Sequence, residues 1–550
     1  MIKKQLKNII DACFNTGITN GLWSDTARDS YAVEVPKHKG QGDFSTNVAL
    51  IIAGKEKKKP REVAQQFSQL LENNEIIEKI EIAGPGFINF FLRSQVWLSV
   101  LPPIYEQGNS FGRSNSGAGK KILVEFVSAN PTGPLSIGHG RNAILGDAIA
   151  KLLEAVGSDV TREYYFNNAG RQMRVLGESV KARYRELLGL DNEFPEDGYQ
   201  GSYIYDIAES IKVENGEAQS DGDVVFFKDK AQEAIFADID NTLQGIGIKF
   251  DSYYNEHTLY EKGLIDDVVA ELKSKDLVYE KDGATWFKTT EFEQEQDRVI
   301  IKNTGEPTYR LPDIAYHREK FRRGFDWMIN VFGADHIATV PDVLAGVRAL
   351  DLDDSKVTVV LHQFVTLLRD GKQVKMSTRK ATFITVDELL EEVGEDALRF
   401  FFLMRKADSQ LEFDLDLATK QSQENPVYYV QYAHARLCSI ERQAEENNII
   451  PASPDEKYLE RLCEAEELAL LKGMAEFPAL VAGAAQDLMP HRVIFYLMDL
   501  AGQFHGFYNK HKVLTDDVEL SGARLTLCGA LKRVLANGLQ LLGVNAPERM

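Results

Sequence analysis

Residues 121–166 read KILVEFVSANPTGPLSIGHGRNAILGDAIAKLLEAVGSDVTREYYF, and this stretch decides the fold. The apolar run KILVEFVS predicts a buried strand, and DVTREYYFN (159–167) predicts a second strand. Between them, apolar residues recur at helical spacing over Gly138–Val156, so we expect a long amphipathic helix there. A strand, a helix and a strand in this order predict a βαβ unit in a parallel sheet.

The same alternation continues to VTVVLHQFV (357–365), which indicates a multidomain α/β protein whose Rossmann-like parallel-sheet domain spans 121–424. An insertion is expected around 190–245, with ENGEAQSDGD (214–223) as an exposed acidic loop. Residues 1–107 predict an N-terminal α+β domain, and the Gly/Ser-rich stretch 108–120 predicts a linker. Residues 425–550 predict an α-helical bundle. Asp43 and Ser45 are expected to cap the helix that follows them.

Composition excludes some classes of protein. The chain has 550 residues, 44% of them hydrophobic, and a net charge of −20, which describes a globular protein and not a disordered acidic polymer. No apolar run approaches the ~18 uncharged residues of a membrane span, and the N-terminus lacks the features of a secretory signal. The four cysteines lie far apart, so no disulfide framework or paired-cysteine metal site is predicted. We therefore expect a cytoplasmic protein with no membrane partner.

Charge is distributed unevenly along the chain. Residues 1–95 carry 13 basic and 11 acidic side chains, and residues 426–550 carry 12 basic and 16 acidic ones. Most of the net charge of −20 therefore falls on the central part. Net charge alone argues against a nucleic-acid partner, but local patches decide that question better than the sum does.

A glycine-rich turn follows the first strand of the βαβ unit. The strand delivers Glu125 to the loop containing Ser128 and Asn130, and Gly138 and His139 open the helix. Glycine lets backbone approach a ligand closely, and free N–H groups at a helix N-terminus suit phosphate. The histidine can donate to a phosphoryl oxygen as charge develops on it. Taken on its own, this segment is better explained by a plain strand–helix turn with a hydrogen-bonded histidine.

A second segment, RDGKQVKMSTRKATFITV (369–386), gathers Lys375, Arg379 and Lys380 beside Ser377 and Thr378. The run TFITV at its end predicts a strand. A cationic loop of this kind can close over a polyphosphate leaving group. An exposed basic hairpin is the alternative.

Taken together, the two segments resemble the HIGH and KMSKS motifs of class I aminoacyl-tRNA synthetases. Further segments resemble the bacterial arginyl-tRNA synthetase family, and they run through nearly the whole chain. They are GDFSTNVAL, AGPGFINF, SANPTGPLSIGHGRNAILGD, PTYRLPDIAYHREKFRRGFD, FGADHIATV, DALRFFFLMRKADSQLEFDLDLA, NPVYYVQYAHARLCSI and the closing APERM. The resemblance is weakest in the insertion around 190–245.

The resemblance implies a reaction and its catalytic residues. An arginyl-tRNA synthetase activates L-arginine with ATP, which arrives with Mg²⁺ as a substrate complex, and transfers it to the terminal ribose of tRNA(Arg). No tightly bound metal is implied. The matching positions are Ser136, Gly138 and His139 of the first motif and Lys375, Met376, Ser377, Thr378 and Arg379 of the second. Ser136 replaces the first histidine and Thr378 the second lysine, so the phosphate contacts at these two positions depart from the family pattern.

The resemblance also assigns an arginine pocket. A guanidinium presents a planar set of donors and no acceptor, so its pocket must offer carboxylates. Tyr309 and Asp313 match the side-chain pocket, and their i, i+4 spacing places both on one face if the segment is helical. Glu125, Ser128 and Asn130 match the residues that hold the α-amino end. Asp335 and His336 follow a strand, where ligands bind in α/β sheets, although a capping Asp and a packed His would fit the same positions.

RNA contacts are expected in the helical C-terminal part. Tyr428, Tyr432 and Arg436 lie at i, i+4 and i+8, where rings can stack on bases and arginine can reach phosphate, or where they can form a core seam. The resemblance makes this part the anticodon-binding bundle, with the terminal Met550 beside it. Further basic candidates are Lys510, His511, Lys512, Lys532, Arg533 and the run from Lys55 to Arg61.

Two other functions stay open from the sequence. One is a class I synthetase for another amino acid. The other is a synthetase-like regulator that binds tRNA but has lost activation, which Ser136 and Thr378 suggest. The family resemblance further implies a monomer whose activation step needs bound tRNA.

Overall fold

The computed structural model describes residues 2–25, 31–36, 38, 40–71, 74–168, 170–374 and 384–550. Its centre is a five-stranded parallel sheet in the order β12-β11-β5-β6-β7. The strands are β5 (Lys121–Glu125), β6 (Asp159–Phe166), β7 (Ser252–Asn255), β11 (Trp327–Gly333) and β12 (Val357–His362). The chain leaves β5 in one direction and returns on its other side at β11. The carboxyl ends of β5 and β11 therefore flank the topological switch point, where α/β sheets bind ligands.

Helix α6 (Ile137–Ala155) connects β5 to β6 as predicted, but it is not amphipathic. Most of its residues are buried, because the sheet covers one side while α15 (Glu395–Leu403) and α18 (Ala465–Gln486) pack on the other. Gly146 lets the helix lie against the sheet, since a Cβ there would lie 2.2 Å from the Phe126 ring. The helix that begins at the predicted site is thus held on both sides.

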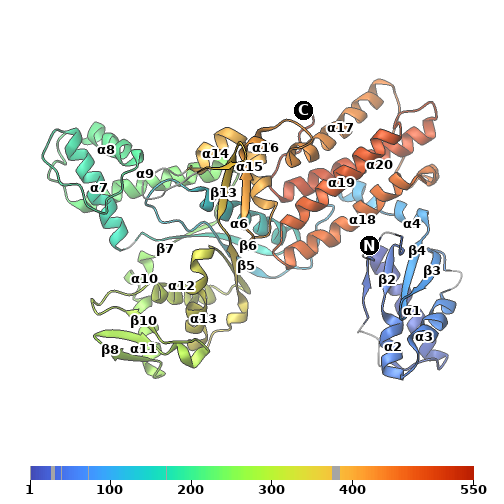
Figure 1. Cartoon of the computed structure of the whole chain (residues 1–550), viewed down its shortest axis with the longest axis horizontal. Coiled ribbons are helices and arrows are strands. Elements are labelled where there is room, and N and C mark those ends of the chain that lie inside the picture. Colours follow the sequence, from blue (N-terminus) through green and yellow to red (C-terminus); the bar gives the residue numbers. More distant parts are fainter. Residues whose placement is uncertain are drawn as a thin grey trace.

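Two insertions leave the sheet. Between β6 and β7 the chain forms α7 (Arg171–Leu187), α8 (Ser202–Asn215) and α9 (Val224–Gly245), the arm at the upper left of Figure 1. Residues 216–223 of the predicted acidic loop connect α8 to α9, whereas Glu214 and Asn215 form the end of α8. Between β7 and β11 lie α10 (His257–Glu261), α11 (Leu264–Ser274), α12 (Arg310–Arg322) and the antiparallel sheet β10-β9-β8, built from β8 (Val278–Lys281), β9 (Ala284–Phe287) and β10 (Arg298–Ile301). Helix α13 (Val340–Ala349) joins β11 to β12.

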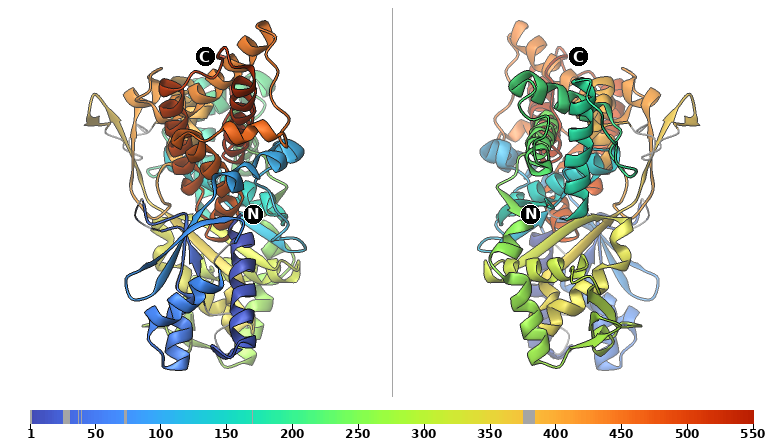
Figure 2. Two further views of the ribbon diagram at one scale, coloured as in Figure 1. Left: turned by 90° about the vertical axis from the view of Figure 1, so that its right-hand side faces the viewer. Right: turned by 90° about the vertical axis from the view of Figure 1, so that its left-hand side faces the viewer.

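The N-terminal part is an α+β unit. Helices α2 (Val48–Glu56) and α3 (Pro60–Leu70) pack on the antiparallel sheet β1-β2-β4-β3, and α1 (Ile2–Thr19) packs against α3. The strands are β1 (Val33–Glu34), β2 (Phe44–Thr46), β3 (Ile77–Ala83) and β4 (Phe87–Leu92). The predicted caps are wrong, because Asn47 occupies the N-cap of α2 and Ser45 lies within β2. Asp43 instead accepts the Leu92 N–H (2.8 Å) and pairs with Lys472 of α18 at 2.5 Å. This pair ties the N-terminal unit to the helices above it in Figures 1 and 2.

The C-terminal part is helical, as the sequence predicts, and contains α17 (Pro426–Glu446), α18, α19 (His491–Lys510) and α20 (Val518–Leu541). By length and composition alone, α18 is the one helix in the described ranges that is apolar enough to cross a membrane. Here it packs against α19, α20 and α6, and its buried Glu467 pairs with Arg524 at 2.7 Å. It serves as a core helix of the bundle in this fold.

A linking segment joins the sheet to the bundle through β13 (Val365–Arg369), β14 (Lys372–Gln373), α14 (Val386–Val393), α15, β15 (Leu411–Asp414) and α16 (Leu415–Thr419). Within it, Arg399 is fully buried. Its guanidinium donates to the Leu542 carbonyl (2.9 Å), to the Ile246 carbonyl (2.7 Å) and to Asp147 of α6. One side chain therefore fastens the C-terminal bundle and the end of the α7–α9 arm to the central helix.

Candidate active site and RNA-binding surface

The loop that follows β5 has an unusual backbone. Val127 and Ser128 have φ values of +64° and +43°, a region that a β-branched residue rarely adopts. Asn142 of α6 holds this turn by accepting the Val127 N–H at 2.6 Å. Ser128 in turn donates its hydroxyl to Oε1 of Glu125 (3.1 Å). Strain retained at the mouth of the crevice, with a dedicated buried partner, is typical of a functional loop.

His139 lies in the first turn of α6 as a neutral donor. The Ser136 N–H donates to its Nδ1 (3.2 Å), so Nδ1 carries the lone pair and the ring proton sits on Nε2. Burial lowers the pKa of His139, and the nearby Asp335 only partly opposes this. A Cβ added at Gly138 would meet only Ser136 Oγ, at 3.7 Å. The turn therefore presents an imidazole N–H and open space at a helix N-terminus, an arrangement that suits phosphate.

An acidic centre lies at the end of β5, from which the loop leads to this turn. Burial raises the pKa of the Asp313 carboxyl to about 8, with further contributions from the carboxylates of Glu125 and Glu256 and an opposing one from Lys320. Burial also raises the pKa of Glu256, whose carboxylate accepts the Tyr165 hydroxyl at 2.9 Å. The ammonium of Lys320 is the cation that contacts Glu125 (2.5 Å), and it also donates to Asn330 (2.8 Å). Three carboxylates around one ammonium leave a site that favours a cationic ligand.

The two predicted pocket residues Tyr309 and Asp313 lie in different environments at the start of α12. Tyr309 is the N-cap and is 68% exposed, whereas Asp313 lies one turn inside and accepts the His317 ring at its carbonyl (2.8 Å). Burial and Lys320 lower the pKa of His317 to about 3, so this imidazole is neutral. Tyr309 is therefore exposed at the start of α12, whereas Asp313 belongs to the acidic centre.

The remaining predicted pocket residues line the edges of the crevice. Asp335 and His336 follow β11 on a 3-10 turn and are largely exposed, with 3.8 Å between Oδ2 of Asp335 and Nε2 of His336. Asn130 donates to Gln172 at the start of α7 (3.0 Å), which connects the substrate loop to the α7–α9 arm.

The second motif, Lys375, Met376, Ser377, Thr378 and Arg379, lies outside the described residues, as does Lys380. Both of its flanks are placed. Val374 donates to the Leu367 carbonyl (2.9 Å), and Thr385 forms a β-bridge with Ser136. The predicted strand TFITV is wrong at its end, because Val386 begins α14 with Thr385 as the N-cap. Thr385 therefore anchors the end of this segment directly beside the His139 turn.

Sequence reasoning missed Lys320, Glu256, Asn142 and Asn330. Lys320 lies in REKFRR, which reads as a solvated basic run, yet its side chain is fully buried. Glu256 sits in an unremarkable stretch after β7. Only the strand order brings these side chains together, so no local signal marked them.

The aromatic stripe on α17 exists as predicted. The rings of Tyr428 and Tyr432 lie 5.9 Å apart at 10°, and the guanidinium of Arg436 lies 4.8 Å from Tyr432 and 4.6 Å from Tyr508. A cavity of about 420 Å³ adjoins them and reaches the half-exposed Met550. The other basic candidates are largely occupied within the chain: Lys510 and His511 pair with Glu466, Lys532 pairs with Glu441, and Arg533 covers Tyr105.

Comparisons with known proteins cover the entire chain. Residues 1–92 match the arginyl tRNA synthetase N terminal domain, residues 101–413 the class I (R) tRNA synthetase catalytic domain, and residues 430–550 the DALR anticodon binding domain. The chain is 64% identical to an arginine–tRNA ligase of Desulfotalea psychrophila over 100% of both chains, and 49% identical to one of Syntrophotalea carbinolica over 100% and 99%. The chain belongs to the arginyl-tRNA synthetase family.

Solved structures agree with this membership. An arginyl-tRNA synthetase structure from Campylobacter jejuni, described as putative in its title, has a TM-score of 0.77 and 32% identity, over 84% of this chain and 100% of that one. The arginyl-tRNA synthetase of Thermus thermophilus shares the fold with a TM-score of 0.76 at 23% identity, over 100% of both chains. Membership in the arginyl-tRNA synthetases confirms the predicted family, the multidomain Rossmann-type fold and the assignment to the class I ligases.

Proposed function

We propose that the chain joins L-arginine to tRNA(Arg) in two steps at the crevice between β5 and β11. In the first, an arginine carboxylate oxygen attacks the α-phosphorus of ATP and pyrophosphate leaves. In the second, a hydroxyl of the terminal tRNA ribose attacks the acyl carbonyl and AMP leaves. The observation that carries this proposal is the acidic centre of Asp313, Glu125 and Glu256, which lies beside a helix N-terminus suited to phosphate.

The acidic centre supports a division of roles in arginine binding. Asp313, with Glu256 behind it, accepts the guanidinium, while Glu125, Ser128 and Asn130 hold the α-amino end. Lys320 holds Glu125 in place through its contact with Oε2. Tyr309 covers the rim. A neutral side chain would leave the buried carboxylates unpaired, so a site of this kind rejects other amino acids by ~10⁴-fold or more without a separate editing site.

The phosphates of ATP contact the two motif segments in this proposal. The Nε2–H of His139 and the N–H groups at the start of α6 face the developing phosphoryl charge, with Ser136 beside them and Gly138 leaving the approach open. Lys375 and Arg379, with Met376, Ser377 and Thr378 between them, supply positive charge for the leaving pyrophosphate, and Asp335 and His336 border the nucleotide. Mg²⁺ that arrives on ATP neutralises phosphate charge. No protein nucleophile is needed, because positioning and charge stabilisation suffice.

The tRNA is proposed to lie across all three parts of the chain. Tyr428, Tyr432, Arg436 and Met550 contact the anticodon loop, within a binding bundle at 425–550. The N-terminal domain (1–107) contacts the outer corner of the tRNA. The catalytic domain (121–424), which follows the linker 108–120, holds the acceptor end. The enzyme acts as a monomer in the cytoplasm, with the basic run from Lys55 to Arg61 as a further contact.

Pyrophosphate exchange tests the function directly. Arginine-dependent exchange between labelled pyrophosphate and ATP is expected only when tRNA(Arg) is added. Exchange that depends on another amino acid would reassign the substrate. Absence of exchange under every condition, with tRNA binding retained, would make the chain a tRNA-binding regulator instead.

A further inference from the structure

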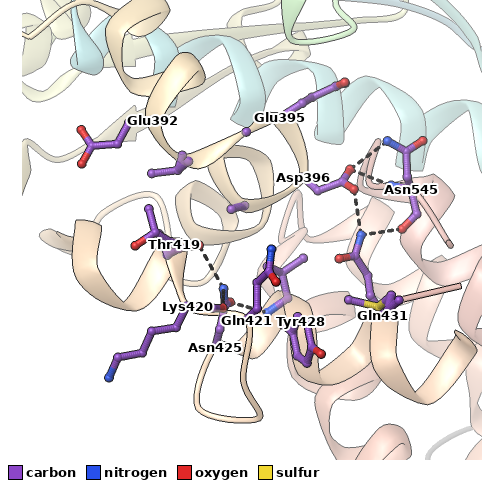
Figure 3. A pocket seen from close by; sticks show the side chains of 16 residues that line it. Glu392, Glu395, Asp396, Thr419, Lys420, Gln421, Asn425, Tyr428, Gln431 and Asn545 are labelled. Carbon is purple, nitrogen blue, oxygen red and sulfur yellow. Dashed lines mark hydrogen bonds between the residues drawn. The ribbon is translucent and has the colours of Figure 1, made fainter. Parts of the chain in front are cut away.

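A cavity of about 790 Å³ lies where the linking segment meets the C-terminal bundle, away from the catalytic crevice. The start of α15, the end of α16, the start of α17 and the C-terminal tail form its walls. Figure 3 shows Asp396 and Asn545 on one side, Gln421 and Lys420 on the other, and Gln431 and Tyr428 between them. Its volume falls within the range of about 300–1,000 Å³ found for ligand pockets.

Gln431 presents a fixed hydrogen-bond acceptor to this cavity. Its side chain is 93% buried, since only 7% of it is exposed. Its Nε2 donates to Asp396 Oδ2 (2.8 Å) and to the Asn545 carbonyl (2.9 Å), so both amide hydrogens are used. No described residue donates to its Oε1, which Figure 3 shows directed away from Asp396, toward the side where Gln421 and Tyr428 lie.

The side-chain amide of Gln431 cannot adopt the flipped orientation, in which Nε2 would face the cavity. A flipped Gln431 would place its carbonyl oxygen against a carboxylate and another carbonyl, three acceptors with no proton between them. Asp396 is itself held, because its Oδ1 accepts the backbone N–H (2.8 Å) and the side-chain amide (3.0 Å) of Asn545. A ligand that contacts Gln431 in this cavity must therefore offer an N–H or O–H donor to Oε1.

The charges on the walls narrow the class of ligand. Glu392, Glu395 and Asp396 line one side, so an anion is disfavoured. A cation also gains little at Glu392 and Asp396, because Arg369 already pairs with both oxygens of Glu392 at 2.7 Å and the Asp396 oxygens are taken by amide donors. A neutral planar group with N–H donors fits both the polarity and the aromatic wall of Tyr428.

We propose that this cavity binds one unstacked nucleobase of tRNA, which stacks on Tyr428 and donates an N–H to Gln431 Oε1. The inference rests on the proposed function, because the base must come from RNA held along α17. Tyr428 begins the stripe that continues through Tyr432 to Arg436, and Met550 lines both this cavity and the one beside Arg436. An RNA strand that follows the stripe therefore passes the mouth of the cavity, where Lys420 is half exposed.

Binding by anticodon stem–loop RNA tests the proposal, read by fluorescence anisotropy. An abasic residue is placed at each loop position in turn. With the wild-type protein, one abasic position is expected to weaken binding by roughly 5- to 150-fold, the size of one base–aromatic stack. The same substitution is expected to cost far less in Tyr428→Ala, because the partner of that base is gone.

Gln431→Met keeps the length of the side chain and removes its acceptor. It is expected to weaken binding of the intact RNA by roughly 2- to 12-fold and to reduce the penalty at the same abasic position. Gln486→Met, at the exposed end of α18, serves as the matched control and should bind like wild type. If Gln431→Met fails to fold, the abasic scan with wild type and with Tyr428→Leu still tests the proposal.

Two results would overturn it: no abasic position whose penalty shrinks in the Tyr428 variant, or unchanged binding by both cavity variants. Failure of the proposed function is a separate outcome, since it shows as absent arginine-dependent exchange in the wild-type enzyme. If no abasic position is coupled to the Tyr428 substitution while arginine-dependent exchange is intact, only the cavity proposal is rejected.

Discussion

The ammonium of Lys320 lies 2.5 Å from Oε2 of Glu125, and the two side chains are 0% and 3% exposed. The pair joins α12 to the end of β5 across 195 residues of sequence. It sets the geometry of the acidic centre, because Glu125 would otherwise be an unpaired buried charge beside Asp313. A buried pair of this kind matters less for its net energy than for what is left when one partner goes.

Lys320→Met is therefore expected to destabilise the protein by about 3–5 kcal/mol, because it leaves Glu125 uncompensated. Denaturant unfolding measures this change. The double variant Lys320→Met, Glu125→Gln should regain part of the lost free energy of unfolding. Its arginine KM should nevertheless be higher than that of the wild type. A double variant no more stable than the single one would contradict the pairing.

The pH dependence of arginine binding should follow Asp313. Its pKa is raised to about 8 in the ligand-free site, so the carboxyl is largely protonated at pH 6 and cannot fully pair with a guanidinium. The arginine KM is expected to fall as pH rises from 6 to 8.5. Exchange assays with tRNA present measure it. In Asp313→Ala, KM should be high and kcat/KM lower by orders of magnitude at every pH, and a wild-type pH profile in that variant would reject the role.

The same proton affects stability in a defined direction. The folded protein holds it more tightly than the unfolded chain, whose aspartates have a pKa of about 3.9. The contribution of Asp313 therefore becomes less favourable as pH rises from about 4 toward 8. Saturating arginine should reverse this trend, since it pairs with the ionised form. Thermal melts with and without arginine, in wild type and in Asp313→Asn, separate this contribution from that of other groups.

His139 is expected to act as a neutral donor throughout the physiological range, because burial lowers its pKa. His139→Ala should reduce the exchange rate by roughly 10²–10³-fold, the cost of one donor to a developing oxyanion. His139→Gln keeps an N–H near the Nε2 position and should lose less. A rate inflection near pH 6.5 that disappears in the glutamine variant would show instead that the ring works in its charged form.

Gly543 packs against the buried Arg399 that joins three parts of the chain. Its φ is +69°, and a Cβ there would lie 2.4 Å from the guanidinium. Gly543→Ala is expected to destabilise the protein by more than the ~1 kcal/mol of backbone strain alone. Gly119→Ala is the matched control, because φ is +81° there and nothing lies within 4 Å. Equal losses of stability in the two variants would contradict this packing argument.

Binding of tRNA should depend only modestly on salt. The 13 and 12 basic residues at the two ends of the chain are matched by 11 and 16 acidic ones, and Lys510, His511 and Lys532 are already paired with carboxylates. In a plot of the logarithm of the binding constant against the logarithm of the salt concentration, each phosphate contact contributes about −0.7 to −0.9 to the slope. The measured slope should therefore correspond to a few contacts. A slope near zero would count against the basic patches, and Arg436→Ala should weaken binding while leaving arginine and ATP KM unchanged.

The amino-acid sequence by itself determined the βαβ unit, the helical C-terminal part, the family and the loop that holds Glu125 and His139. These features depend on local periodicity or on short motifs, which can be read along the chain. It did not predict the real partner of Asp43, the burial of α6 on both sides or the helical turn that begins at Val386. The first two depend on elements distant in sequence, whereas α14 begins with a local capping box of Thr385 and Glu388, which was overlooked.

Only the tertiary structure decided the composition of the acidic centre. Glu125, Glu256, Asp313 and Lys320 meet because the strand order brings the ends of β5 and β7 and the helix α12 to one side of the sheet. Whether a charged side chain is solvated or buried is settled by such long-range packing, and burial is what moves its pKa and gives it a role. A lysine in a basic run and a glutamate after a strand thus look ordinary in sequence and become part of the site only in the folded protein.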